Sequence, residues 1–136
     1  MKLLALLSTV LMGIIPSGHA HAATKGAFCP QWQDSAKAAG WTTKNIPIVD
    51  KLMHRESRCR PMALNSTLNK DGSSDYGLMQ INDKTWCLPS KYSATGYLQA
   101  RKIIKTCKDL LDPQTNLIAA LAVYQAADNS FSPWGL

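Results

Sequence analysis

Two acidic residues in the middle of the chain have the type and the surroundings that cleavage of a glycosidic bond requires. Glu56 ends an amphipathic helical pattern on its apolar side, and Asp75 follows a turn signal at Asp71-Gly72. Acid-catalysed cleavage of such a bond uses one carboxyl group kept away from water and another kept in polar surroundings. The pair therefore predicts a glycosidase.

A helix must position Glu56. Asn45 can cap this helix, and Pro47 is tolerated in its first turn. Positions i, i+3, i+4 and i+7 then share one face: Val49, Leu52, Met53 and Glu56. The other face carries Lys51, His54 and Arg55. Two interpretations of Glu56 remain open at this point. Either the helix frays and the carboxylate reaches water, or the apolar stripe continues and burial disfavours the charged form, which suits a general acid.

A turn and a strand pattern must position Asp75. Residues 69–72 (Asn-Lys-Asp-Gly) form the turn signal, with Gly72 able to take a positive φ. Alternation along a strand places one set of side chains on one face, namely Asp75, Gly77, Met79 and Ile81. Tyr76, Leu78 and Gln80 fall on the other face. We expect a small antiparallel hairpin sheet here.

The remaining pattern is mostly helical. Pro30 can open a first helix that ends near Gly40, residues 83–86 resemble a short helical turn, and residues 96–111 contain a helical stretch. Asp112 is placed to cap the clearest helix, with Pro113 at its first position. Its apolar face comprises Leu117, Ala120, Leu121 and Tyr124.

The last segment, residues 129–136, predicts an irregular tail that packs Phe131 and Trp134 back onto the domain. No internal repeat, low-complexity tract or linker interrupts the sequence. The 136 residues therefore predict one domain of the α+β class, mostly helical, with one small inserted sheet.

The first 22 residues have the pattern of a secretory signal peptide. Lys2 gives a positive start, residues 3–15 are almost wholly apolar, and small residues precede cleavage sites after Ala22 or Ala20. The apolar run is too short to span a bilayer as a helix, so we expect no stable membrane anchor after processing. This pattern predicts a secreted protein, periplasmic or extracellular, with residues 23–136 as its folded domain.

The formal net charge is +6, and it falls to +5 when Lys2 leaves with the signal peptide. The basic residues are spread out, with no block of five or six and no aromatic residues interleaved. A secreted basic protein is attracted to anionic polymers such as bacterial cell walls. No groove-reading motif is present, so nucleic acid is not expected as a partner.

Four cysteines lie in the exported part: Cys29, Cys59, Cys87 and Cys107. An oxidising compartment favours two disulfides, and three pairings are possible. We favour Cys29 with Cys59 and Cys87 with Cys107, because each bond then ties neighbouring segments. His54 is the one histidine left after processing and no Cys-x-x-Cys occurs, so neither a zinc site nor any other metal or organic cofactor is expected.

An ordered series of motifs in residues 56–87 resembles the c-type lysozymes. The matching pieces are Glu56-Ser57, Ala63-x-Asn65, Asp71-Gly72-Ser73-x-Asp75-Tyr76-Gly77-x-x-Gln80-Ile81-Asn82 and Trp86-Cys87. The chain also resembles the soluble-type lytic transglycosylases of bacteria and phages. Their motifs match Glu56-Ser57, Gly77-Leu78-Met79-Gln80 and a C-terminal helix from Asp112-Pro113 to Val123-Tyr124. The two families together imply a lysozyme-like fold with a cleft between sheet and helices.

The resemblance assigns a role to each carboxyl group. Glu56 matches the general acid in both families. Asp75 matches the second carboxylate of c-type lysozymes, which acts as nucleophile or stabilises the positive sugar. The transglycosylases generally lack that carboxylate and use the substrate's own N-acetyl group and 6-hydroxyl, which yields an anhydro sugar.

The resemblance also implies residues that bind the substrate: Ser57, Asn65, Gly77, Gln80, Ile81, Asn82 and Tyr124. Gln80 offers a donor and an acceptor to an acetamido group. Ordinary strand packing explains Ile81 equally well, and a core position explains Tyr124 equally well. The chain reads Tyr-Gln-Ala-Ala at 124–127 where transglycosylases usually read Tyr-Asn-Ala-Gly, which weakens that assignment.

These observations predict a monomeric, secreted muramidase that cleaves the β-1,4 bond between N-acetylmuramic acid and N-acetylglucosamine in peptidoglycan. Hydrolysis and anhydro-forming transglycosylation both remain open, with hydrolysis favoured by Asp75. A non-catalytic protein that binds peptidoglycan or oligosaccharide on the same fold is a second hypothesis. A purely structural, disulfide-stabilised secreted protein is a third.

Overall fold

The computed structural model describes residues 24–136, so the predicted signal peptide lies outside the described residues. In chain order the elements are η1 (Pro30–Trp32), α1 (Gln33–Ala38), α2 (Ile46–Ser57), β1 (Leu64–Asn65), β2 (Asp75–Tyr76), β3 (Ile81–Asn82), α3 (Asp83–Trp86), α4 (Tyr97–Ala100), η2 (Cys107–Leu111), α5 (Pro113–Ala126) and η3 (Ser132–Trp134). The three elements labelled η are short 3₁₀ helices. Among residues 24–136, no helix has the length and apolar character needed to cross a membrane.

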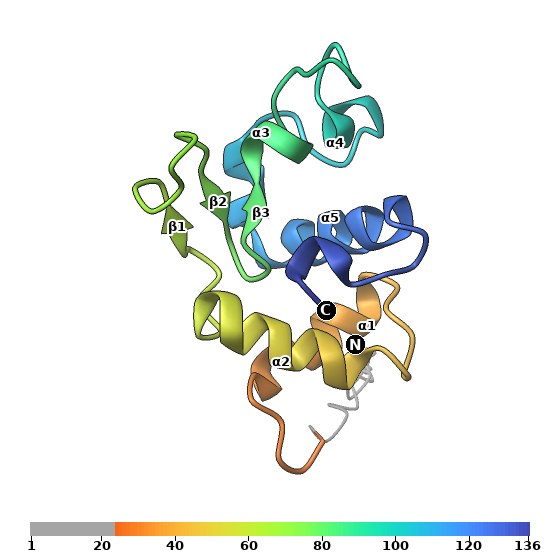
Figure 1. Cartoon of the computed structure of the whole chain (residues 1–136). Coiled ribbons are helices and arrows are strands. Elements are labelled where there is room, and N and C mark those ends of the chain that lie inside the picture. The colour runs from red at the N-terminus through yellow and green to blue at the C-terminus, as the bar shows by residue number, and fades with distance from the viewer. Residues whose placement is uncertain (1–23) are drawn as a thin grey trace, which may run out of the picture.

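The sheet lies at one side of the helices (Figure 1). Its three short strands run antiparallel in the order β1-β2-β3, with Asp75 opposite Asn65 on one side and opposite Asn82 on the other. In the view of Figure 1, α2 runs below the sheet, α5 lies beside it, and α3 and α4 form a separate upper lobe. The predicted α+β class and the small antiparallel sheet are confirmed.

Helices α2 and α5 form where the sequence predicts them. Val49, Leu52 and Met53 on α2 are almost fully buried, as the periodicity requires. Asn45 occupies the N-cap position of α2, although its side chain makes no capping hydrogen bond. Asp112 does cap α5, because its Oδ2 accepts a hydrogen bond of 2.8 Å from the amide of Thr115.

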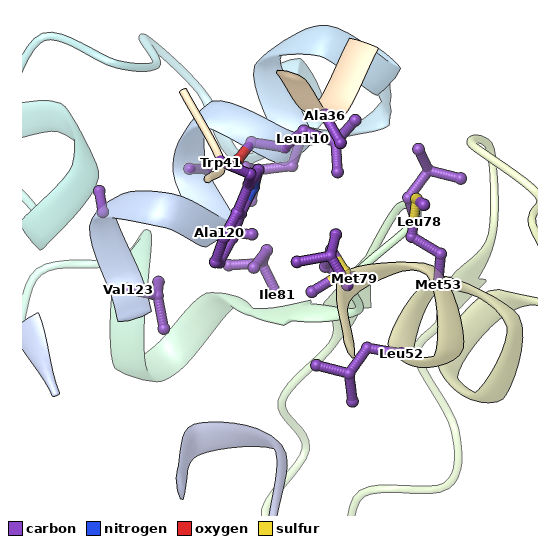
Figure 2. Packing of buried hydrophobic residues seen from close by; sticks show 14 of the residues in the cluster. Ala36, Trp41, Leu52, Met53, Leu78, Met79, Ile81, Leu110, Ala120 and Val123 are labelled. Atoms are coloured by element: carbon purple, nitrogen blue, oxygen red, sulfur yellow. Dashed lines mark hydrogen bonds between the residues drawn. The ribbon is translucent and has the colours of Figure 1, made fainter. Parts of the chain in front are cut away.

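The core lies between α2, α5 and the turn that joins β2 to β3 (Figure 2). Met79 and Ile81 lie between Leu52 of α2 and Ala120 of α5 in this view, and all four are at most 2% exposed. The small side chains of α5 let it pack closely on several sides. They are Ala119, Ala120 and Ala122.

The strand alternation predicted for residues 75–81 is wrong between residues 77 and 80. Instead of continuing the strand, the chain turns back, with the amide of Gln80 donating to the carbonyl of Gly77 at 3.2 Å. Gly77 and Gln80 both take a positive φ, of 75° and 46°. Leu78 and Met79 are therefore both buried, although alternation would place them on opposite faces.

A buried amide, that of Asn116 on α5, explains this turn. Its Oδ1 accepts from the amide of Met79 at 2.9 Å, and its Nδ2 donates to the carbonyls of Tyr76 and Leu110, both at 2.8 Å. Asn116 is fully buried. Two of these hydrogen bonds satisfy backbone groups of the tight turn and of the strand that leads into it, and the third joins α5 to η2.

The helical stretch predicted over residues 96–111 is broken into α4 and η2. Lys102 takes a left-handed φ of 58°, which ends the first piece. The second piece begins with a capping box, in which Asp109 accepts from the amides of Lys105 and Thr106 at 2.8 and 2.9 Å. These local hydrogen bonds compete with a continuous helix.

Both favoured disulfides are present. The Cα atoms of Cys29 and Cys59 lie 5.5 Å apart, and those of Cys87 and Cys107 lie 5.6 Å apart. The first bond ties the N-terminal segment to the end of α2, and the second closes the α3–α4 lobe onto η2. The predicted packing of the C-terminal tail is also confirmed, because Trp134 is 9% exposed and its Nε1 donates to the carbonyl of Met79 at 2.8 Å.

We predict that Gly77→Ala destabilises the fold by about 2–4 kcal/mol. A Cβ at this position would meet Asn116 Nδ2 and the carbonyl of Leu110, both at 2.3 Å, on a backbone with positive φ. Gly72→Ala is the matched control, because Gly72 has a similar φ of 72° but open space around its Cβ position. Urea unfolding of both variants measures the difference. Equal losses in the two variants would show that Asn116 does not restrict the turn.

The hydrogen bonds to Asp109 also predict a pH dependence of stability. Donation from the amides of Thr106 and Lys105 holds the pKa of this carboxyl below its ordinary value of 3.8. A carboxyl whose folded pKa is lowered stabilises the fold above its unfolded pKa, and this contribution disappears as the pH falls through the folded value. We expect Asp109→Asn, which does not titrate, to lose less stability than the unmodified chain between about pH 5 and pH 2. The midpoints of urea unfolding, measured for both proteins across this pH range, test the prediction. An equal loss of stability in the variant and the unmodified chain would contradict it.

Candidate functional site

A cleft of about 940 Å³ separates the sheet from the helices. Its lining comprises Glu56, Arg60, Met62, Ala63, Leu64, Asn65, Leu68, Asp75, Gln80, Ile81, Asn82, Trp86, Val123, Pro133 and Trp134. Both predicted catalytic carboxyl groups are among them, although they come from different elements. The cleft is open to solvent, its lining residues extend from α2 to α3, and they include both polar and apolar side chains.

Glu56 lies on the last turn of α2, where the chain leaves the helix. Arg58 and Cys59 take left-handed φ values of 55° and 62°, which turns the chain sharply toward β1. The Glu56 side chain is 24% exposed, so neither a fully frayed end nor a dry pocket describes it. The helix places its carboxyl at the wall of the cleft and leaves it partly in contact with water.

Arg55 is the hydrogen-bond partner of this carboxyl. Its Nε and Nη2 donate to Oε1 of Glu56 at 2.8 and 2.6 Å, and Nη2 also donates to the carbonyl of Trp134. The guanidinium thus joins the end of α2 to the C-terminal segment that forms part of the cleft wall. This role is not predictable from the helical pattern, which places Arg55 on the solvent face of α2.

Asp75 is held by amide side chains on both neighbouring strands. Its register partners Asn65 and Asn82 donate through Nδ2 at 3.2 and 2.8 Å, and Asn69 from the preceding turn donates at 2.7 Å. Cross-strand neighbours on one face lie close enough for such contacts. Three donors fix the rotamer of the carboxylate and surround it with polar groups, as the sequence predicted for the second acid.

The predicted binding residues Gln80, Ile81 and Asn82 all line the cleft. Gln80 uses its Nε2 internally, donating to the carbonyls of Ala63 and Gly77 at 3.2 and 3.0 Å, so its carbonyl oxygen is what it can offer a ligand. Ile81 is 2% exposed and serves the core as well as the cleft floor. Asn82 caps α3 through Oδ1, which accepts from the amide of Thr85 at 3.2 Å.

Three predicted binding residues do not line the cleft. Ser57 is buried and its hydroxyl donates to the carbonyl of Met53 at 2.9 Å. Gly77 faces the side chain of Asn116, so the space beside this glycine is filled by the protein and not by a ligand. Tyr124 packs against Trp41 and Phe131, with ring centroids 5.3 and 4.6 Å away. These positions support the fold around the cleft.

Several cleft residues were not predicted as functional. Asn69 appeared only as part of the turn, and Trp134 only as a packing residue. The apolar rim formed by Met62, Leu64 and Leu68 carries no periodic signal, because Met62 and Leu68 lie in loops and the strand that holds Leu64 is only two residues long. Within residues 24–136, no group of three or more His, Cys, Asp or Glu side chains is placed to hold a metal ion.

The chain is similar in sequence to curated proteins that are named lysozymes. The lysozyme of Hyalophora cecropia is 36% identical over 67 residues, which are 49% of this chain and 44% of that protein. The lysozyme of Galleria mellonella is 34% identical over 101 residues, which are 74% of this chain and 71% of that protein. The chain thus spans about half the length of some curated relatives that it matches, and more of others.

A solved structure shares the fold. The crystal structure of a lysozyme from Litopenaeus vannamei superposes with a TM-score of 0.54 at 22% identity, over 75% of this chain and 69% of that one. The family model described as "Lysozyme like domain" matches residues 33–135, nearly the whole described chain. The chain therefore belongs to the lysozyme-like domain family.

Proposed function

We propose that this protein is a secreted muramidase that hydrolyses the β-1,4 bond between N-acetylmuramic acid and N-acetylglucosamine in peptidoglycan. The observation that carries the proposal is that one cleft is lined by Glu56 from a helix and Asp75 from the sheet. A glycan strand lying in that cleft would have a carboxyl group on either side of one bond. The relatives reported above are named lysozymes, which supports the same reaction.

Glu56 is the proposed general acid. Among residues 24–136, Arg55 occupies Oε1 and no hydrogen bond reaches Oε2, so Oε2 is the oxygen that can carry a proton for the leaving sugar. A guanidinium binds the ionised carboxylate, however, whereas an acid must be protonated. The mechanism therefore requires a bound glycan to loosen the Arg55–Glu56 pair as it fills the cleft and excludes water.

Asp75 is the proposed stabiliser or nucleophile. Bond cleavage develops positive charge on the anomeric carbon and ring oxygen of the sugar, and a fixed carboxylate beside them lowers the energy of that state. Asn65, Asn69 and Asn82 hold the carboxylate in place before the substrate arrives. Little reorganisation is then needed during the reaction. A water molecule completes hydrolysis, activated by the Glu56 carboxylate after it has given up its proton.

Export of the chain is part of the proposal. The predicted signal peptide would direct it out of the cytoplasm, and the two disulfides of the described domain suit an oxidising compartment.

We predict that Glu56→Gln lowers turnover of peptidoglycan by about 10²–10⁴-fold, because the amide cannot donate a proton as an acid does. Asp75→Asn should lower it by about 10²-fold, through the loss of charge beside the sugar cation. Release of soluble sugar from purified peptidoglycan measures both effects. Asp128→Asn is the matched control, since this exposed carboxylate lies outside the cleft. Thermal unfolding checks that each variant is folded, and full activity of folded Glu56→Gln would refute the proposed acid.

We also predict that the products are hydrolysed rather than anhydro sugars. A transglycosylase lacks this second carboxylate and uses groups of the substrate in its place. Because the present chain has Asp75, we expect water to complete the reaction. Mass spectrometry of the released muropeptides decides this, because an anhydro product is lighter by one water. Predominantly anhydro ends would assign the chain to transglycosylation while leaving Glu56 as the acid.

A further inference from the structure

The positive charge of the described chain is concentrated in one segment. Residues 84–108 hold six Lys or Arg side chains and no Asp or Glu, whereas the rest of residues 24–136 holds eight basic and nine acidic side chains. The six are not consecutive, so no basic block is visible in the sequence. They are Lys84, Lys91, Arg101, Lys102, Lys105 and Lys108.

The fold gathers this segment into one structural unit. Residues 84–108 contain most of α3 and all of α4, which lie at the top of the view in Figure 1, and the start of η2, which packs against α5 and β2. The Cys87–Cys107 disulfide closes the segment on itself. We call it the basic lobe. All six basic side chains are exposed.

Within residues 24–136, none of these cations forms a close ion pair. The ion pairs of residues 24–136 involve Lys37 with Asp34 and Arg55 with Glu56, and no cation of the basic lobe takes part in them. The nearby carboxylate of Asp109 is occupied by the backbone amides that it caps. Lys84 lies near Asp71 and donates to its backbone carbonyl, and Lys105 lies near Asp109, so these two cations are partly balanced. The lobe as a whole still presents a mainly positive field to solvent.

A second, smaller cavity lies on the basic lobe. It has a volume of about 390 Å³ and is lined by Tyr97, Arg101, Ile103, Ala122, Gln125 and Ala126, so it is bounded by α4 on one side and α5 on the other. The guanidinium of Arg101 stacks over the ring of Tyr97 with its Cζ 3.5 Å from the ring centroid. Stacking holds the planar group in one orientation, and Nη1 also donates to the carbonyl of Tyr97 at 3.5 Å. Within residues 24–136, Nε and Nη2 make no hydrogen bond, so they are the donors that a ligand can use.

The basic lobe adjoins the cleft. Asn82 and Trp86 line the cleft, Lys84 stands between them in the sequence, and Trp86 packs edge-on against Tyr97 with ring centroids 5.2 Å apart. Tyr97 in turn lines the second cavity. A polymer whose sugar backbone lies in the cleft would therefore pass beside this lobe.

We propose that the basic lobe is a second contact site for the polymer that the cleft cuts, and that it binds the carboxylates of the peptide side chains attached to the glycan. Arg101 is the centre of the site, because a guanidinium matches a carboxylate with two parallel hydrogen bonds. The inference rests on the proposed function for the identity of the polymer. The site itself is independent of the catalytic residues.

Binding to insoluble peptidoglycan tests the proposal, with Glu56→Gln as the background in every chain so that the polymer stays intact. Phosphate-containing polymers are first removed from the peptidoglycan, so that carboxylates are the remaining anions. In this background, Lys102→Gln/Lys105→Gln/Lys108→Gln should weaken binding by about tenfold at low salt. The matched control is Lys25→Gln/Lys44→Gln/Lys51→Gln, which removes the same charge from exposed positions elsewhere and should change binding by less than about twofold.

Three further measurements make the result specific. Converting the peptidoglycan carboxylates to amides should abolish the difference between the two triple variants. Arg101→Lys should weaken binding several-fold, because it keeps the charge but loses the paired donors. Cleavage of a neutral N-acetylglucosamine oligomer by the chain with Glu56 intact should be unchanged by the lobe substitutions.

Equal weakening by both triple variants would show that net charge alone drives adsorption, and would overturn the proposal. So would a lobe effect that survives amidation, or that appears only on peptidoglycan still carrying phosphate polymers. Failure of the proposed function would be seen in the activity assay, as an inactive unmodified chain or a fully active Glu56→Gln variant. The binding measurements would still show whether the basic lobe binds carboxylates.

Discussion

The arrangement of the cleft depends on the buried side-chain amide of Asn116. Its three hydrogen bonds join α5 to the carbonyls of Tyr76 and Leu110 and to the amide of Met79. Because the amide is fully buried, any movement of the turn would leave polar groups without partners, at a cost of about 1–3 kcal/mol each. The turn between β2 and β3 is therefore fixed relative to α5 and η2, and with it the sheet wall of the cleft that carries Asp75.

The two carboxyl groups that line the cleft come from separate elements and have different surroundings. Glu56 is carried by the last turn of α2, is partly exposed and has a guanidinium as its neighbour. Asp75 is carried by the central strand and accepts only from neutral amides. Different surroundings for two like groups are the condition for different roles in glycoside cleavage.

Much of the helical structure and part of the site could be predicted from the sequence, because the signals there are local. Asp112 and Pro113 mark the start of α5 within two residues, and the Asn69–Gly72 turn marks the hairpin. The turn at residues 77–80 was not predictable in this way, since Asn116, which lies far along the chain, decides it. The role of Arg55 was not predictable for the same reason, because its second partner, the carbonyl of Trp134, is 79 residues away in the sequence. The prediction of Tyr124 as a cleft residue followed the family resemblance, and the structure places it against Trp41 instead.

The most direct test of the account is a crystal structure of the Glu56→Gln chain with an N-acetylglucosamine hexasaccharide. The account predicts that the sugar fills the cleft, with the side chain at position 56 within about 3 Å of one glycosidic oxygen and Asp75 facing the anomeric carbon of the same bond. Asn116 should keep its three partners in this complex. A sugar bound outside the cleft, or one whose bonds all lie beyond reach of position 56, would contradict the proposed reaction.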